Sequence, residues 1–388
     1  MTSEILIMNN KAIVMAADSA VTVGGKKTYN GVNKLFMLSN NPPMGIMIFG
    51  SATFDSIPLE TLIKEYRKQT NFKELGHIEK IKENFIEYIE KTTDDINFTL
   101  LKNELFRFKN FLLTQLENIS KENITTYINS SENMEIFPFL NEKCLEDELE
   151  KVSQELCKKG IGVDVNILKK SFSESILKSS SGIVIAGFNE NDFFPSFVSF
   201  KLIAKYNGKI ITYDENSQIN YNGNGIIPFA QTDVIRTFIF GIDEHLEESI
   251  LNYFYNFLEL YPKFLIDEIK SNKKINGKSL NNTIQEIKKS KKLNDDIMRN
   301  FIDTIESLKE SIYGPIFDSI GSLPKDELAS MAESMIHITS LKRKISSDLE
   351  SVGGDIDVAI ISKGDGFIWK KRKHYFKSEL NPHFFDKE

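Results

Sequence analysis

The first residues of the chain alternate between short apolar runs and a polar turn. Ile5–Met8 and Ala12–Ala17 are apolar, and Asn9-Asn10-Lys11 between them has the composition of a tight turn. Each run is long enough for a strand and too short for a helix of ordinary length. The pattern therefore predicts a β-hairpin at the start of the chain.

Further strands are expected downstream of this hairpin. Tyr29–Ser39 has the composition of a strand region, Pro42-Pro43 interrupts it, and Met44–Phe49 is an apolar run typical of a buried strand. Leu59–Lys68 then has helical periodicity, and Ser181–Phe188 has the composition of another buried strand.

Apolar residues recur at helical spacing over the segment 72–178. Phe85 and Ile89 are typical of this pattern, because residues four apart lie on one face of a helix. The Pro138 region and Gly160-Ile161-Gly162 interrupt the pattern. The segment therefore predicts several helices inserted between the strands.

A second helical segment covers 242–322. Leu246–Ile269 is predicted to be helix with a break or kink near Pro262, and Leu280–Ile312 is predicted to be helix after a polar loop. Asp326–Ser351 is then expected to return to the strands as one more helix. We expect the two helical segments to form a lobe that covers the functional site or directs assembly.

Composition excludes several classes of function. The chain of 388 residues has a formal net charge of −7 and a pI near 5.5, which argue against a general nucleic-acid binder. Two cysteines, Cys144 and Cys157, predict no disulfide framework and fit a reducing compartment. No leader and no long apolar segment is evident, so we expect a cytoplasmic protein without a membrane span. Scattered histidines predict neither a metal nor a cofactor.

Three residues near the N-terminus indicate hydrolytic chemistry. Thr2 follows the initiator Met1, Asp18 comes sixteen residues later, and Lys34 comes sixteen residues after that. Removal of Met1 is expected because a small residue follows it, and Thr2 would then carry a hydroxyl and a free α-amine. A neighbouring amine can take the proton of a hydroxyl and so activate it as a nucleophile.

The chain resembles the proteasome β-subunit and HslV-type family, the threonine-type N-terminal-nucleophile (Ntn) hydrolases. The resemblance rests on the spacing just given, on Ala16-Ala17-Asp18-Ser19, and on Gly50-Ser51-Ala52 before the first helix. The downstream stretches that also resemble the family are Ser181–Phe188 as a central strand, Gly223-Asn224-Gly225 as a turn leading to a helix, and Gly353-Gly354 before a strand over Ile356–Ser362.

The resemblance implies a division of roles among the three N-terminal residues. Thr2 Oγ would be the nucleophile, and its α-amine would be the general base, directly or through a water. Lys34 would lower the cost of deprotonating the hydroxyl through its positive charge, and Asp18 would hold the Lys34 ammonium in place.

The resemblance also implies contacts to the substrate. The backbone N–H of Gly50 would form the oxyanion hole, where glycine permits a close approach of backbone and substrate. Thr22 and Ala52 would bind the substrate, with Thr22 on an edge to which an extended peptide adds as a β-strand.

Two parts of the family's proton network differ in this sequence. Asn224 stands where the family often has a serine beside the nucleophile's amine, and its amide can still donate and accept hydrogen bonds. Asp348 and Ser351 keep the three-residue spacing of a family pair, but one position early, so that Leu349 and Val352 occupy the family's places. A one-residue bulge would restore the pair.

The expected fold class is α+β: a four-layer αββα Ntn-hydrolase sandwich with large helical insertions. The expected segments are 1–71 for the first part of the core, 72–178 and 242–322 for the insertions, 179–241 for the central strands, and 323–388 for the last helix, strands and a basic-aromatic tail.

The expected function is a proteasome-like threonine peptidase that cleaves peptide bonds through an acyl-enzyme. Two alternatives remain open: an Ntn amidase acting on a small amide, and a catalytically weak assembly or sensing subunit on the same fold. The expected partners are a peptide or unfolded-protein substrate and further copies of this chain in a dimer or ring. Family members work with ATPases, but nothing in this sequence indicates one.

Overall fold

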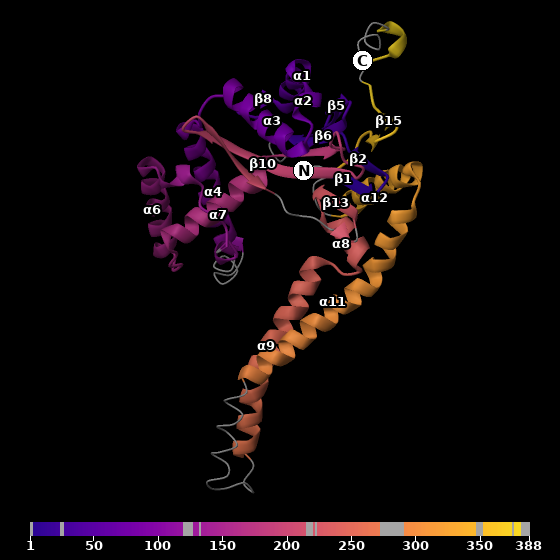
Figure 1. The fold of residues 1–388 in the computed structure, drawn as a ribbon. Helices are drawn as coiled ribbons and strands as arrows, with labels where there is room; N and C mark the ends of the chain where they lie inside the picture. The colour runs from indigo at the N-terminus through magenta and orange to yellow at the C-terminus, as the bar shows by residue number, and fades with distance from the viewer. Residues whose placement is uncertain are drawn as a thin grey trace.

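The computed structural model describes most of the chain. The described residues are 3–23, 27–118, 127–131, 133–214, 220–221, 223–271, 291–346, 352–374 and 376–381. Within them, two antiparallel β-sheets form the centre of the molecule, and helices lie around them (Figure 1). The fold class of the described chain is therefore α+β, as predicted.

The larger sheet contains the N-terminal hairpin. Its strand order is β12-β13-β1-β2-β14-β15, with every pairing antiparallel. The strands are β1 Ser3–Asn9, β2 Ala12–Ala17, β12 Asn220–Tyr221, β13 Asn224–Ala230, β14 Asp357–Ser362 and β15 Gly366–Lys371. The predicted hairpin and the predicted strand after Gly353-Gly354 are confirmed.

The smaller sheet has the strand order β11-β10-β9-β6-β5. Its strands are β5 Leu35–Asn40, β6 Pro43–Gly50, β9 Ser181–Gly187, β10 Ser196–Tyr206 and β11 Lys209–Asp214. Two ribbons complete the strands, β3 Ala20–Val23 with β4 Lys27–Asn30, and β7 Thr53–Phe54 with β8 Ile57–Pro58. Strands β6 and β9 confirm the two buried strands expected from their apolar runs.

The two sheets pack face to face. Alternate residues of a strand point to opposite faces, and β1 therefore divides its side chains between two cores. Leu6 packs in a cluster with Met47 and Val184 of the smaller sheet, whereas Ile5 and Ile7 pack on the other face, against helices. Because both faces are covered, every residue of β1 and β2 is buried.

Helices cover the outer face of each sheet. Those on the larger sheet are α8 Asp233–Phe240, the end of α11 Lys291–Ser322, and α12 Lys325–Ile345. Those on the smaller sheet are α1 Leu59–Gln69, α2 Phe72–Leu75 and α3 Ile78–Thr92. A short 3₁₀ turn, η2 Ser378–Leu380, lies near the end of the chain.

A helical lobe follows α3 and packs around a separate apolar core, to which Ala204 of β10 also belongs. It contains α4 Phe98–Asn118, the 3₁₀ turn η1 Pro138–Asn141, α6 Lys143–Lys158 and α7 Val165–Ser179. Leu105, Leu149 and Phe172 are buried together in this core. The predicted interruptions near Pro138 and at 160–162 are confirmed.

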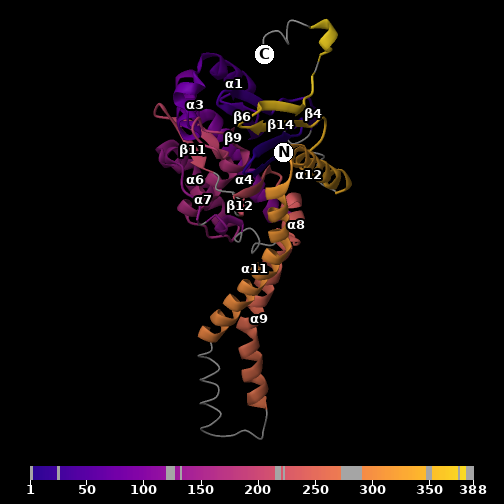
Figure 2. The ribbon, with the colours of Figure 1, turned by 45° about the vertical axis from the view of Figure 1, so that its right-hand side comes forward.

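The second helical segment is a long hairpin that projects away from the sheets (Figures 1 and 2). Helix α9 spans Glu244–Ser271 and packs against α11. Of the expected break or kink near Pro262, the break is wrong, because α9 continues through this residue. Helix α11 continues beyond the predicted end at Ile312, to Ser322. In the described part of the chain, no helix combines the length and apolar character needed to cross a bilayer.

Two local predictions also need correction. The expected strand over Tyr29–Ser39 is divided in two, because β4 ends at Asn30 and β5 begins at Leu35. Gly31 turns the chain between them with a φ of +112°, and Lys34 therefore lies in the connection before β5. The expected turn at 223–225 is largely strand, because Asn224 and Gly225 begin β13 by pairing with Tyr221 and Asn220.

Candidate active site

Lys34 lies between two buried carboxylates. Its Nζ forms an ion pair with Asp18 Oδ1 and a second ion pair, at 3.3 Å, with Glu4 Oε1. The side chains of Glu4 and Asp18 are fully buried, and that of Lys34 is 3% exposed. Charged groups are rarely buried in this way unless they are paired. We refer to these three residues as the charge cluster.

The β1–β2 hairpin places both carboxylates beside the start of the chain. Glu4 pairs with Ala17 in the hairpin, so Asp18 follows directly beside Ser3. The Asp18 N–H donates to Ser3 O at 3.2 Å, and the Ser3 N–H donates to Asp18 Oδ1 at 3.1 Å. Thr2, the predicted nucleophile, lies outside the described residues and is bonded covalently to that Ser3 nitrogen.

Backbone donors hold the Asp18 carboxylate from several sides. Besides the Ser3 N–H, the N–H groups of Ala20 and Gly353 donate to Oδ2 at 3.3 and 3.0 Å. Hydrogen bonds to an ionised acceptor are stronger than neutral ones, and this set fixes the carboxylate in one orientation. The Gly353-Gly354 turn, predicted from the sequence, therefore reaches the charge cluster.

Gly50 lies close to Lys34 along the neighbouring strand. The Ile48 N–H donates to Lys34 O at 2.8 Å, and Gly50 ends β6 two residues further on. Gly50 has a φ of +74°, and a Cβ at this position would lie 2.5 Å from Ser180 O. Only glycine therefore fits this strand end without a backbone shift.

A cavity opens beside Gly50. It is lined by Ser51, Thr53, Ser180, Ser181 and Lys205, among others. Ala52, the second predicted substrate contact, is partly exposed between Gly50 and the β7–β8 ribbon. Its carbonyl accepts a hydrogen bond from the Leu59 N–H at 2.9 Å, which ties this turn to the start of α1.

Asn224 lies apart from the charge cluster. In the β1–β13 pairing, Ser3 is opposite Ala230 and Met8 is opposite Gly225, so Asn224 belongs to the far end of β1. Its Nδ2 donates to Phe317 O at 3.2 Å, and the side chain is buried against α11. The structure therefore does not bring Asn224 to the start of the chain, and its contacts are those of a packing residue.

Other predicted site residues cannot be placed beside this cluster. Asp348 and Ser351 lie outside the described residues, as Thr2 does. Thr22 belongs to β3 by its backbone, and its side chain is not described. Among the described residues, no group of three or more histidine, cysteine, aspartate or glutamate side chains is arranged to hold a metal ion.

Two polar residues at this end of the sheet were missed by sequence reasoning. Glu4 was overlooked because the predicted strand began at Ile5, although an acid immediately before an apolar run was a visible signal. Gln231 follows Ala230, the partner of Ser3, and is buried. Its Oε1 accepts from Arg343 Nε at 2.6 Å, a long-range contact that no local pattern could indicate.

Comparison with known proteins gives little support for a family. No protein-family model matches the sequence, and no curated protein matches it. Among solved structures, Anbu (ancestral beta-subunit) from Yersinia bercovieri aligns over 99% of this chain and 93% of its own, with a TM-score of 0.32 and 8% identity. A likeness at this level carries no argument about function, which must rest on the residues of this chain.

Proposed function

We propose that this protein is a threonine-type N-terminal-nucleophile hydrolase that cleaves peptide bonds, with Thr2 as its nucleophile after removal of Met1. The observation that carries this proposal is the buried charge cluster of Glu4, Asp18 and Lys34 beside the start of β1. Fixed charges that are already in place before the reaction are a common means of stabilising developing charge in catalysis. The buried and paired charges of this cluster support such a role.

The proposed reaction uses the two groups of Thr2. Its α-amine takes the proton of Oγ, and Oγ attacks the substrate carbonyl carbon. The peptide C–N bond breaks as the amine product leaves with a proton, and the acyl group remains on Oγ as an ester. Water then hydrolyses the ester and regenerates the hydroxyl.

The other residues act on charge and position in this proposal. Lys34 lowers the cost of forming the alkoxide through its positive charge, and Asp18 and Glu4 hold the Lys34 ammonium in place. The Gly50 backbone N–H stabilises the oxyanion, since β6 ends next to Lys34. The cavity beside Ser51 and Thr53 receives a substrate side chain.

The architecture is consistent with this proposal. Two facing antiparallel sheets with helices outside both are the arrangement expected for the four-layer αββα Ntn-hydrolase sandwich. In that assignment the helical lobe and the projecting hairpin are the two insertions.

A catalytically weak subunit is the second candidate. The position of Asn224 favours it, because the amide lies at the wrong end of β1 to assist the Thr2 amine. The two candidates differ in whether a free Thr2 amine sits beside the charge cluster.

The test is peptide hydrolysis by the wild type and two Thr2 variants. Thr2→Ala lacks the hydroxyl, and we expect turnover to fall to background with the melting temperature unchanged. Thr2→Ser keeps the hydroxyl and the amine, and serves as the matched control that retains measurable turnover. Equal hydrolysis by wild type and Thr2→Ala would refute the proposed nucleophile. A wild type inactive on every peptide would favour the second candidate.

A further inference from the structure

Helix α9 exposes a continuous stripe of large apolar side chains. Each of its six members is between 38% and 76% exposed. The members are Leu246, Ile250, Tyr253, Phe257, Leu260 and Phe264, which we call the α9 stripe. Isolated exposed apolar residues are ordinary, but a contiguous row indicates a surface that binds something.

The spacing of the α9 stripe is that of a coiled-coil seam. The steps between successive members alternate between four and three residues, the pattern of heptad positions a and d. Ile250, Phe257 and Phe264 take position a in this register. A seam of this kind is matched by a second helix that inserts its own side chains between them.

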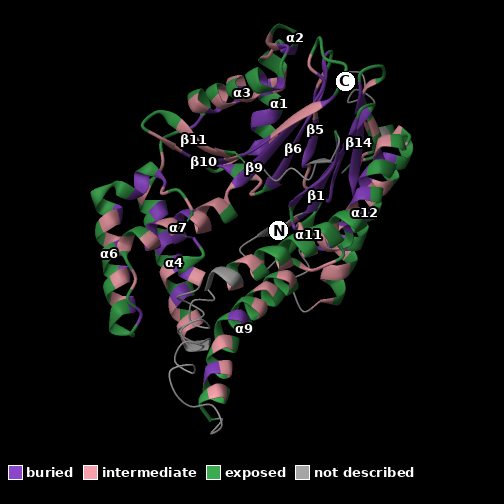
Figure 3. Cartoon of the chain, turned by 60° about the horizontal axis from the view of Figure 1, so that its bottom comes forward, coloured by how far each residue is buried: buried purple, intermediate pink, exposed green. Residues whose placement is uncertain are grey.

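The α9 stripe is distinct from the face that α9 packs on α11. That inner face contains Leu258 and Ile266, both buried, and Phe254, whose ring centroid lies 4.2 Å from that of Phe301. Tyr253 and Phe257 of the stripe directly precede Phe254 and Leu258 of the inner face, and one position is a rotation of about 100° around the helix. Figure 3 shows α9 as exposed or partly exposed over most of its length. The hairpin is therefore closed internally and still has an uncovered apolar face.

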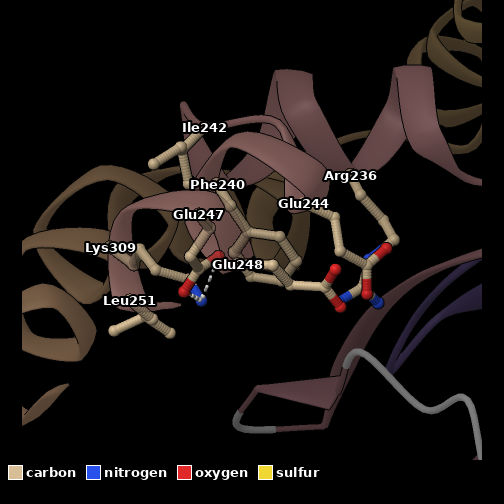
Figure 4. A pocket seen from close by; sticks show the side chains of 8 residues that line it. All are labelled: Arg236, Phe240, Ile242, Glu244, Glu247, Glu248, Leu251 and Lys309. Atoms are coloured by element: carbon tan, nitrogen blue, oxygen red, sulfur yellow. Dashed lines mark hydrogen bonds and ion pairs between the residues drawn. The ribbon is translucent and has the colours of Figure 1, made fainter. Parts of the chain in front are cut away.

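Ionic contacts at the base of the hairpin join α9 to α11 and to α8 (Figure 4). Lys309 on α11 forms an ion pair with Glu247 on α9 at 2.9 Å, and Arg236 on α8 forms one with Glu244 at 3.6 Å. Both cations also lie over the Phe240 ring, 5.3 and 5.4 Å from its centroid. These contacts fix α9 at its base, so that its stripe is presented as a preformed surface.

We propose that the α9 stripe pairs with the same stripe of a second copy of this chain, in parallel, as a two-stranded coiled coil. Lys263 and Glu268 occupy positions g and e, five residues apart. In a parallel pair, each Lys263 faces Glu268 of the second copy, which is the attractive g–e arrangement of such dimers. An antiparallel pair that aligned the two stripes end to end would instead place Lys263 opposite Ser249.

The area is sufficient for a specific dimer. An aromatic side chain buries about 150–250 Å² and a leucine or isoleucine side chain somewhat less, so the six half-exposed members, three of them aromatic, contribute roughly 600 Å² per copy. The pair would bury about 1,200 Å², the lower end of the range for stable specific interfaces. This inference does not depend on the proposed hydrolase activity, because the stripe lies on the projecting hairpin and not beside Lys34.

The first test measures the oligomeric state by light scattering and sedimentation. We expect the wild type to be dimeric, and Tyr253→Glu/Phe264→Glu to raise the dissociation constant at least 100-fold. Phe106→Glu is the matched control, because Phe106 is 60% exposed on α4 and Phe264 is 67% exposed on α9. We expect this control to stay dimeric. A monomeric wild type, or a stripe variant that associates like the control, would overturn the proposal.

A second test fixes the direction of pairing. In a background with Cys144→Ser and Cys157→Ser, which removes the two exposed cysteines, Leu260→Cys should form an interchain disulfide under mild oxidation. Glu259→Cys, one position away from the seam, should not. If Leu260→Cys links only to a partner that carries Ile250→Cys, the helices are antiparallel and the proposed arrangement is wrong.

Discussion

Two regions of this molecule depart in opposite directions from the usual division of polar and apolar residues. At the start of β1, Glu4, Asp18 and Lys34 are buried. Along α9, the six large apolar side chains of the α9 stripe are exposed. Neither arrangement favours folding, since a buried charge loses its hydration and an apolar side chain that stays exposed gains no free energy from burial. The buried charges and the exposed apolar side chains therefore each require a compensating interaction.

The two compensations differ in kind. The charge cluster is compensated within the chain, by ion pairs and by backbone donors to Asp18. The α9 stripe has no such compensation among the described residues, and we assign it to a second copy of the chain. The helical lobe of α4, α6 and α7 shows the ordinary case, because large apolar side chains of its helices are buried in one core between the helices and β10.

The largest effect is expected from removal of the cation in the charge cluster. Lys34→Met leaves Glu4 and Asp18 buried without their shared partner, and breaking a buried pair in this way costs about 3–5 kcal/mol. Urea denaturation should show this loss, and peptide turnover should fall by orders of magnitude. Adding Glu4→Gln should recover part of the stability but none of the turnover. If Lys34→Met lowered the free energy of unfolding by less than about 1 kcal/mol, Lys34 would not be the partner that stabilises the buried carboxylates.

The next largest effect comes from comparing a buried leucine of the helical lobe with an exposed leucine of the α9 stripe. Leu149 is fully buried in the lobe, and Leu149→Ala should destabilise the protein by about 2–5 kcal/mol. Leu260→Ala on the α9 stripe removes the same atoms from an exposed site, and should change unfolding by less than about 0.5 kcal/mol at concentrations where the protein is monomeric. Similar losses for the two variants in denaturant titrations would show that the α9 stripe is covered by the chain itself.

A smaller contrast lies within the charge cluster. Asp18→Asn would turn amide hydrogens towards backbone N–H donors. Because these donors would then lack an acceptor, we expect the free energy of unfolding to fall by roughly 2 kcal/mol. Glu4→Gln should cost less stability in thermal unfolding, because the ion pair of Lys34 with Glu4, at 3.3 Å, is longer than its ion pair with Asp18. The reverse order would mean that Glu4, and not Asp18, is the main anchor of Lys34.

The smallest effect concerns the base of the hairpin. Burial lowers the pKa of Lys309, but hydrogen bonds and charges from Glu247 and Glu306 outweigh it, and the pKa stands above its ordinary value of 10.5. A cation with a raised pKa stabilises the fold fully below 10.5 and loses this contribution as the pH rises through its folded pKa. Lys309→Met should lower stability at pH 7 by about 1 kcal/mol, with a smaller difference at pH 11. A difference in melting temperature between the wild type and Lys309→Met that is the same at pH 7 and pH 11 would contradict this.

Sequence reasoning succeeded where apolar periodicity determines the structure. The β1–β2 hairpin, α1, β6, β9 and β14 follow from runs whose burial requires one particular element. It also anticipated the pairing of Asp18 with Lys34. Of the break or kink predicted at Pro262, the break is wrong: α9 continues through this residue while it packs on α11.

The remainder of the site depends on contacts that are distant in the sequence. Asn224 was assigned from a local Gly-Asn-Gly pattern, but its position is set by the register of β13 on β1. Gln231 reaches the Ser3 end of β1 through that same register. The role of Glu4 follows from Lys34, thirty residues away, and no periodicity shows that the two side chains meet.

The central claim is that the charge cluster serves a free N-terminal threonine. Intact mass of the purified protein, before and after treatment with an epoxyketone or β-lactone probe, tests it most directly. We predict loss of Met1 and a single adduct that maps to Thr2, absent from Thr2→Ala. A retained Met1, or a free Thr2 that forms no adduct, would contradict the claim.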